Sequence, residues 1–126
     1  MTPSPRGEAL IKSYEKCRLT AYMPTAHDVP TIGWGTTGKD IHLGMTWTQA
    51  QCDERFHHDL SRFAAAVDGM VAHPGTNQNQ FDAMVSFAYN EGAEALRRSI
   101  LIQFHNKGDF KGAAIYFMHY TTHCVV

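Results

Sequence analysis

The stretch LIKSYEKCRLTAY, residues 10–22, contains a change in hydrophobic period that decides the fold. Its first half has apolar side chains at helical spacing: Leu10, Ile11 and Tyr14. Its second half begins an alternation of apolar with polar residues, as in half-buried strands, that continues one residue beyond the stretch: Leu19, Ala21 and Met23. Ser4-Pro5 favours a helix start, because serine caps helices and proline suits the first helical position. The pattern predicts a helix from there to about Cys17, followed directly by a strand.

Downstream of this stretch the sequence predicts a small antiparallel sheet. Residues 24–28 are typical of a turn, and residues 29–35 indicate a second strand whose glycines permit bends or close approach. A third short strand is expected over residues 41–43, between two glycines.

After Thr46 the pattern is helical throughout. Thr46 and Thr48 are competing N-caps, because each has a glutamine three residues later in the capping-box position. The long helix that follows carries an apolar stripe: Phe56, Leu60, Phe63, Val67 and Met70. Its other face is polar: Asp53, Glu54, His57, Asp59 and Arg62. Further helices are expected over residues 77–91 and 99–105 and after Asp109. We therefore predict an α+β fold with one domain, residues 1–126, whose sheet lobe (about 15–45) is joined by the long helix to a helical lobe (about 46–126).

Composition excludes several classes of protein. The 126 residues include eleven Lys and Arg against twelve Asp and Glu, without a run of like charge, so we expect no binding to nucleic acid. No apolar run approaches the length of a membrane span, and the N-terminus lacks a signal-peptide pattern, which favours synthesis in a cytoplasm. The three cysteines, Cys17, Cys52 and Cys124, are odd in number and favour reduced thiols.

Glu15 is the first candidate for catalysis. It borders the apolar stripe of the opening helix, where that helix gives way to the sheet. Partial burial there would disfavour the charged carboxylate, raise its pKa and keep it protonated as a general acid. On position alone, an ordinary solvated glutamate at a helix end is the simpler explanation.

Asp28 and Thr31 are the next candidates, in the turn and the second strand. Glycosidic cleavage needs two carboxyls across a cleft, one protonated and one ionised. If the hairpin folds back beside the helix end, Glu15 can face this turn, and the Thr31 hydroxyl can help to hold an attacking water. Turn preference also explains Asp28, and β-propensity also explains Thr31.

Residues 10–22, together with PTIGWGTTG (30–38), TWTQAQ (46–51) and NQNQFDAMVSFAYNEG (77–92), resemble the phage-type lysozymes. These are endolysin muramidases of glycoside hydrolase family 24, and the resemblance runs in order from about Glu8 to Phe117. It implies a lysozyme-like fold and hydrolysis of the β-1,4 bond between N-acetylmuramic acid and N-acetylglucosamine in peptidoglycan. It also implies no metal and no cofactor, and action on the cell wall after release from the host cytoplasm.

The resemblance assigns roles by position. Glu15 matches the general acid of the family and Thr31 its catalytic threonine. The family aspartate falls at Pro24, so Asp28, the only carboxylate in the turn, takes the water-activating role by default. Substrate contacts are expected from the chain near the strand glycines and from the helical lobe: Gly33, Gly35 and Ser99.

The sequence also departs from the family. Thr36 replaces the usual histidine after Gly35, and the chain resembles a member shortened at its C-terminus, which would leave a helical face uncovered. We therefore keep open a shortened, inactive module that binds glycan or protein, and a homo-oligomer formed through the uncovered face.

Two other groups of residues give weaker indications of a binding site. His57 and His58 are adjacent and point apart on a helix, while His119, His123 and Cys124 are too few for a zinc site of known spacing. Trp34 and Trp47 could stack on sugar rings or pack in the core.

Overall fold

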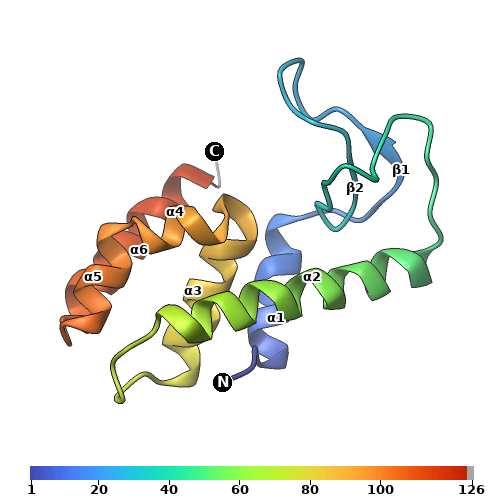
Figure 1. Cartoon of the computed structure of the whole chain (residues 1–126). Helices are drawn as coiled ribbons and strands as arrows, with labels where there is room; N and C mark the ends of the chain where they lie inside the picture. The colour runs from blue at the N-terminus through green and yellow to red at the C-terminus, as the bar shows by residue number, and fades with distance from the viewer. Residues whose placement is uncertain (125–126) are drawn as a thin grey trace. The chain divides into compact units, whose positions relative to one another are not determined.

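We describe the protein from a computed structural model, which defines the backbone of residues 1–124 and the side chains of residues 1–120. The order of elements, coloured along the chain in Figure 1, is α1 (Pro5–Tyr14), β1 (Arg18–Tyr22), β2 (Thr31–Gly33), α2 (Gln49–Met70), α3 (Gln78–Glu91), α4 (Ala93–Arg97), α5 (Ile100–Asn106) and α6 (Phe110–Cys124). Over residues 1–124 these are six helices and a two-stranded antiparallel sheet, which confirms the predicted α+β class. None of these helices is both long and apolar enough to cross a bilayer.

The chain forms two compact units. Residues 12–61 make one, called here the sheet unit, while residues 1–11 and the chain from Arg62 onward make the other, the helical unit. The boundaries fall inside α1 and inside α2, so the sheet unit starts earlier and ends later than the sheet lobe predicted at about 15–45. Whether both units belong to a single domain stays a prediction.

The start of α1 follows local rules. Ser4 Oγ accepts a hydrogen bond from the Gly7 amide at 3.1 Å, as an N-cap should. Ser4 also donates through its amide and its hydroxyl to the Asp82 carboxylate of α3, which accepts a third bond from Gln78. The sequence did not reveal this buried carboxylate, because Ser4, which donates two of its hydrogen bonds, is 78 positions away. At the other end α1 stops at Tyr14, earlier than the predicted Cys17, because the chain must turn before β1 begins at Arg18.

The start of α2 resolves the competition between the two threonines. Thr48 forms the capping box with Gln51, because its hydroxyl accepts from the Gln51 amide at 3.2 Å and its amide donates to Gln51 Oε1 at 2.8 Å. Thr46 instead makes an isolated bridge with Thr20 of β1. On the predicted polar face of α2, Asp59 is an exception, since it is buried.

The sheet is smaller than predicted. β1 pairs antiparallel with β2, with Arg18 opposite Gly33 and Tyr22 opposite Thr31. The predicted strand over residues 41–43 is wrong: Ile41 is buried in a small core cluster, but its backbone lies in a loop that turns at Gly44, where φ is +94°. Pairing with β1 occurs just after this turn, where the Ala21 amide donates to the Met45 carbonyl. Trp47 packs against the same cluster, which comprises Ala21, Ile32 and Ile41.

The helical unit has the larger apolar core. The helix expected over residues 77–91 is α3: Asn77 and Gln80 form its capping box, and the Gly92 amide closes its end on the Ala88 carbonyl. Asp109 caps α6 through the Gly112 amide at 2.8 Å. The short helix α4 was not predicted. Core side chains come from α2 to α6: Val67, Phe81, Met84, Val85, Leu96, Leu101 and Ala113.

One face of the helical unit is apolar and open. α3, α5 and α6 enclose a hollow of about 290 Å³ lined chiefly by apolar side chains, among them Met84, Leu101 and Phe117. Met118 beside it is 65% exposed. A homo-oligomer formed through this face stays a prediction.

Candidate active site

Glu15 lies in the three-residue link between α1 and β1. Its amide donates to the Lys12 carbonyl at 3.3 Å, which extends the last turn of α1 by one residue. The carboxyl lies directly against the backbone of Gly35: a Cβ atom built on Gly35 would be 2.9 Å from Glu15 Oε2 and 3.1 Å from Oε1. The structure therefore brings together two of the residues singled out in the sequence.

A tight loop, residues 32–36, places Gly35 there. Ile32 and Thr36 exchange two backbone hydrogen bonds, of 3.0 and 2.8 Å, across only three intervening residues. Gly33 and Gly35 both have positive φ, +63° and +84°, a conformation that side chains with a Cβ atom rarely adopt. Gly33 lies against Trp47 and Cys52. The two glycines are thus required by the backbone of this loop.

Burial raises the pKa of Glu15 above its ordinary value. The cause is the loss of water around the carboxyl, which disfavours the anion. This is the direction expected of a group that must hold a proton and then donate it near neutral pH.

The loop is anchored by side chains that sequence reasoning had not grouped. Trp34, between the two glycines, donates its indole N–H to Asp53 Oδ1 on α2 at 2.8 Å. The Lys12 ammonium lies 4.9 Å from the centres of both the Trp34 and the Phe56 rings. The strand predicted over residues 29–35 gave no indication that Trp34 turns toward α2.

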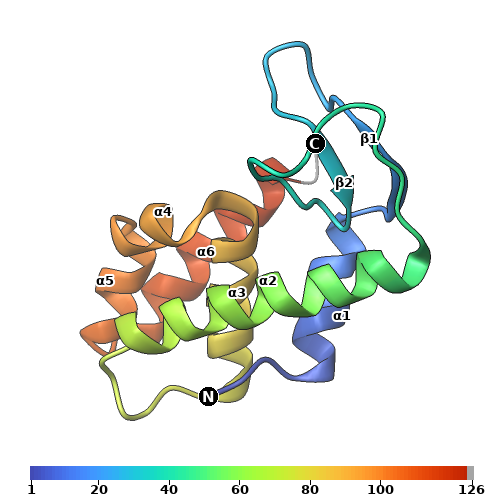
Figure 2. The same ribbon diagram turned by 45° about the vertical axis from the view of Figure 1, so that its right-hand side comes forward.

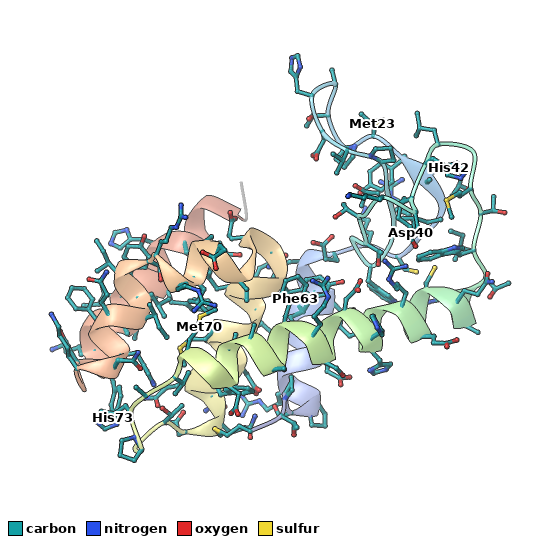
Figure 3. The ribbon with its side chains drawn as sticks, viewed as in Figure 1. Met23, Asp40, His42, Phe63, Met70 and His73 are labelled. Atoms are coloured by element: carbon teal, nitrogen blue, oxygen red, sulfur yellow. The ribbon has the colours of Figure 1, made fainter. Side chains whose placement is uncertain are left out.

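Asp28 and Thr31 both hydrogen-bond to the backbone of Val29. Asp28 is exposed, and its Oδ1 accepts from the Val29 amide at 2.9 Å. Thr31 is buried, and its hydroxyl donates to the Val29 carbonyl at 3.0 Å. The chain between the strands, residues 23–30, projects from the sheet in both views (Figures 1 and 2), and Met23, labelled in Figure 3, marks its start.

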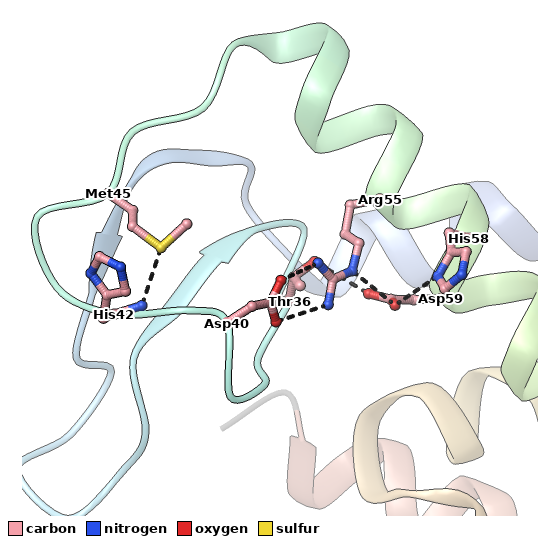
Figure 4. A network of polar contacts seen from close by, with 7 residues as sticks. All are labelled: Thr36, Asp40, His42, Met45, Arg55, His58 and Asp59. Atoms are coloured by element: carbon pink, nitrogen blue, oxygen red, sulfur yellow. Dashed lines mark hydrogen bonds and ion pairs between the residues drawn. The ribbon is translucent and has the colours of Figure 1, made fainter.

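A polar network ties the next loop to α2 (Figure 4). Arg55 donates to both carboxylate oxygens of Asp40, at 2.8 and 3.4 Å, and to Asp59 Oδ1 at 3.3 Å. The Arg55 guanidinium lowers the pKa of Asp40. Thr36, at the end of the 32–36 loop, donates to Asp59 Oδ2 at 3.4 Å. The buried Asp59 therefore helps to fix the end of the loop that covers Glu15.

Ser99 belongs to the helical unit. It caps α5: its hydroxyl accepts from the Ile102 amide at 3.3 Å and donates to the Leu96 carbonyl at 2.7 Å. The structure thus explains the residue by its helix, and a contact with glycan stays a prediction.

Within the described side chains, the cysteines and histidines form no second site. Cys52 is buried, and this burial, with the nearby Cys17 thiol, raises its pKa to about 11, which disfavours a nucleophilic thiolate. Among the described side chains no three metal-ligating groups gather. The side chains of His123 and Cys124 lie outside the described residues.

Comparison with known proteins identifies the family. The Phage lysozyme family profile matches residues 12–124. The endolysin of Lactococcus phage c2 is 48% identical over 94 residues, which cover 73% of this chain and 40% of that protein. The endolysin of Bacillus phage B103 is 40% identical over 120 residues, 94% of this chain and 45% of that protein. Among solved structures, the endolysin from Escherichia coli O157:H7 phage FAHEc1 has a TM-score of 0.82 at 37% identity, covering 95% of this chain and 76% of that one.

The chain spans less than half the length of the c2 and B103 endolysins. Its own match to the family profile nevertheless extends through both units, from the residue three before Glu15 to the end of α6. The chain belongs to the phage lysozyme family.

Proposed function

We propose that this protein hydrolyses bacterial peptidoglycan as an endolysin-type muramidase, with Glu15 as the general acid. The observation that carries the proposal is the covered carboxyl: in a chain of the phage lysozyme family, Glu15 lies under Gly35 and burial raises its pKa. A protonated carboxyl can give its proton to the glycosidic oxygen as the bond to the leaving sugar breaks.

The second half of the reaction falls to Asp28 and Thr31. Asp28 is exposed, so its carboxyl is open to solvent, where it can take a proton from an attacking water. The Thr31 hydroxyl already donates to the Val29 carbonyl, so toward a water it acts as an acceptor. Attack on the face opposite Glu15 inverts the anomeric centre of N-acetylmuramic acid and releases N-acetylglucosamine at the β-1,4 bond. Gly33 and Gly35 would let the glycan approach the loop backbone, and Ser99 would add a contact.

Peptidoglycan strands are the proposed substrate, with no metal or cofactor in the reaction. The proposed course is synthesis in the host cytoplasm and action on the wall after release.

The proposal is tested by clearing of permeabilised bacterial cells together with release of reducing sugar ends. We expect Glu15→Gln to lose activity by roughly 10²- to 10⁴-fold, the usual contribution of a general acid. Glu54→Gln is the matched control, because Glu54 is an exposed glutamate on α2 in the same unit. If Glu15→Gln clears cells as fast as the unchanged protein, the proposal is wrong.

A parallel measurement separates cleavage from binding. Asp28→Asn should reduce the rate while peptidoglycan pull-down is unchanged. If instead the unchanged protein binds peptidoglycan but releases no reducing ends, it is a binding module and not an enzyme.

A further inference from the structure

The centre of the 32–36 loop, which covers Glu15, is held by a single side chain. Gly33 and Gly35 have no side chains with which to hold the loop, so Trp34 is the residue through which the middle of the loop can be fixed. Its indole N–H donates to Asp53 Oδ1 at 2.8 Å, and its ring meets Phe56 edge-on with centroids 6.3 Å apart. Both partners lie on α2, which gives the loop a rigid support.

Asp53 is itself held as an anion. Besides the indole it accepts from Gln49 Nε2 at 3.0 Å. These two hydrogen bonds lower the pKa of Asp53, and the charges of Lys12 from α1 and His57 from α2 contribute in the same direction. An ionised acceptor makes a stronger hydrogen bond to the indole than a neutral one does. The loop is therefore held by a charged cluster, called here the clamp, which comprises Asp53, Trp34 and Lys12.

We propose that Asp53 is a positioning residue for the reaction: by holding the Trp34 indole, it keeps Gly35 against the Glu15 carboxyl and so excludes water from the acid. Neither Asp53 nor Trp34 touches the reacting atoms in this account. The inference rests on the proposed role of Glu15 and adds the device that maintains its protonation.

The experiment uses three variants of the full chain. Trp34→Phe keeps an aromatic ring but removes the N–H, and Asp53→Ala removes the acceptor. Asp53→Asn removes the negative charge but keeps an amide oxygen that can accept from the indole. The pKa of Glu15 is measured directly in each by a ¹³C NMR titration of its side-chain carboxyl, which does not depend on any hydrolysis.

We expect Trp34→Phe and Asp53→Ala each to lower the pKa of Glu15 toward its ordinary value, and the double variant to lower it no further. Asp53→Asn should lower it by less than Asp53→Ala does, because the amide oxygen still accepts from the indole, although more weakly than a carboxylate. The last variant is decisive, because removing a negative charge would by itself also lower the pKa of a neighbouring carboxyl. A lowered pKa in Asp53→Asn with none in Trp34→Phe would mean that Asp53 acts by charge alone, and the inference would be overturned.

The hydrolysis rate supplies a second readout. As the alkaline limb of the pH profile moves down, the rate at pH 7 relative to pH 5 should fall by roughly threefold or more in Trp34→Phe. Glu54→Ala, also on α2, should leave the profile unchanged.

The two hypotheses fail in different ways. An unchanged protein that does not cleave peptidoglycan rejects the proposed function, whatever the NMR titrations show. Active protein in which Trp34→Phe and Asp53→Ala both leave the pKa of Glu15 unmoved rejects the clamp alone.

Discussion

Two loops of the sheet unit are built differently: one covers Glu15, the proposed general acid, and the other contains Asp28, the proposed general base. The 32–36 loop is closed by two backbone hydrogen bonds, anchored to α2 through Trp34, and pressed on the Glu15 carboxyl. The 23–30 segment projects from the sheet, and the exposed Asp28 within it accepts a hydrogen bond from the adjacent Val29 amide.

The contrast matches what acid and base need. A general acid must be kept from water so that it stays protonated, whereas a general base must stay solvated enough to remain ionised. The Glu15 carboxyl lies against a fixed backbone, whereas the Asp28 carboxyl is open to solvent.

The largest effect is expected at Gly35. In Gly35→Ala the methyl group would meet the Glu15 carboxyl at about 3 Å, and φ is +84°, which together displace the loop or the acid. We expect at least a roughly tenfold loss of activity and about 1–3 kcal/mol of destabilisation.

Gly44→Ala is the control for this prediction. It has a similar φ of +94° but nothing within 4 Å of the new methyl group. It should lose stability, measured by urea unfolding, while keeping its activity. Equal losses of activity in both variants would show that strain, and not contact with Glu15, is responsible.

The next largest difference between the two loops is expected in the hydrogen-exchange rates of their backbone amides. The Ile32 and Thr36 amides are bonded within a buried bridge, whereas the Val29 amide is bonded only to an exposed carboxylate. We expect the first two to exchange at least about tenfold more slowly by NMR, because local opening exposes the projecting segment more readily. Comparable rates would mean that the 32–36 loop opens as easily as the other.

A smaller effect is expected in the pH dependence of stability. Because burial raises the folded-state pKa of Glu15, the folded protein holds this proton more tightly than the unfolded chain does. Glu15 therefore stabilises the fold less as the pH rises from 4.5 through its folded pKa. Glu15→Gln cannot titrate, so its unfolding free energy relative to the unchanged protein should be higher at pH 7 than at pH 4. A difference that is constant between these pH values would contradict the burial of Glu15.

The smallest effect is expected for the stability of Asp28→Asn. The amide oxygen can still accept from Val29, and the residue is exposed. The free energy of unfolding, measured by thermal denaturation, should therefore change by no more than about 0.5 kcal/mol. Asp28→Asn should therefore lose activity while its free energy of unfolding stays close to that of the unchanged protein. A large loss of stability would mean that the projecting segment is held more firmly than its contacts indicate.

Local features were predicted correctly because short-range contacts decide them. The Ser4 cap and both ends of the helix expected over residues 77–91 depend on residues within four positions. The strand expected at residues 41–43 was wrong because Ile41 could be buried equally well from a loop. Thr46 and Thr48 could not be separated, because the outcome depended on pairing with Thr20, many residues away.

The amino-acid sequence by itself determined the α+β class, the ends of the best-capped helices, the family and the prominence of Glu15, because periodicity, caps and motifs are all written in neighbouring residues. Only the tertiary structure revealed that Gly35 covers the Glu15 carboxyl and that Asp53 on α2 holds the loop through Trp34. Both contacts join segments nearly twenty residues or more apart, and which side chains meet over such separations is decided by packing, which local pattern does not encode.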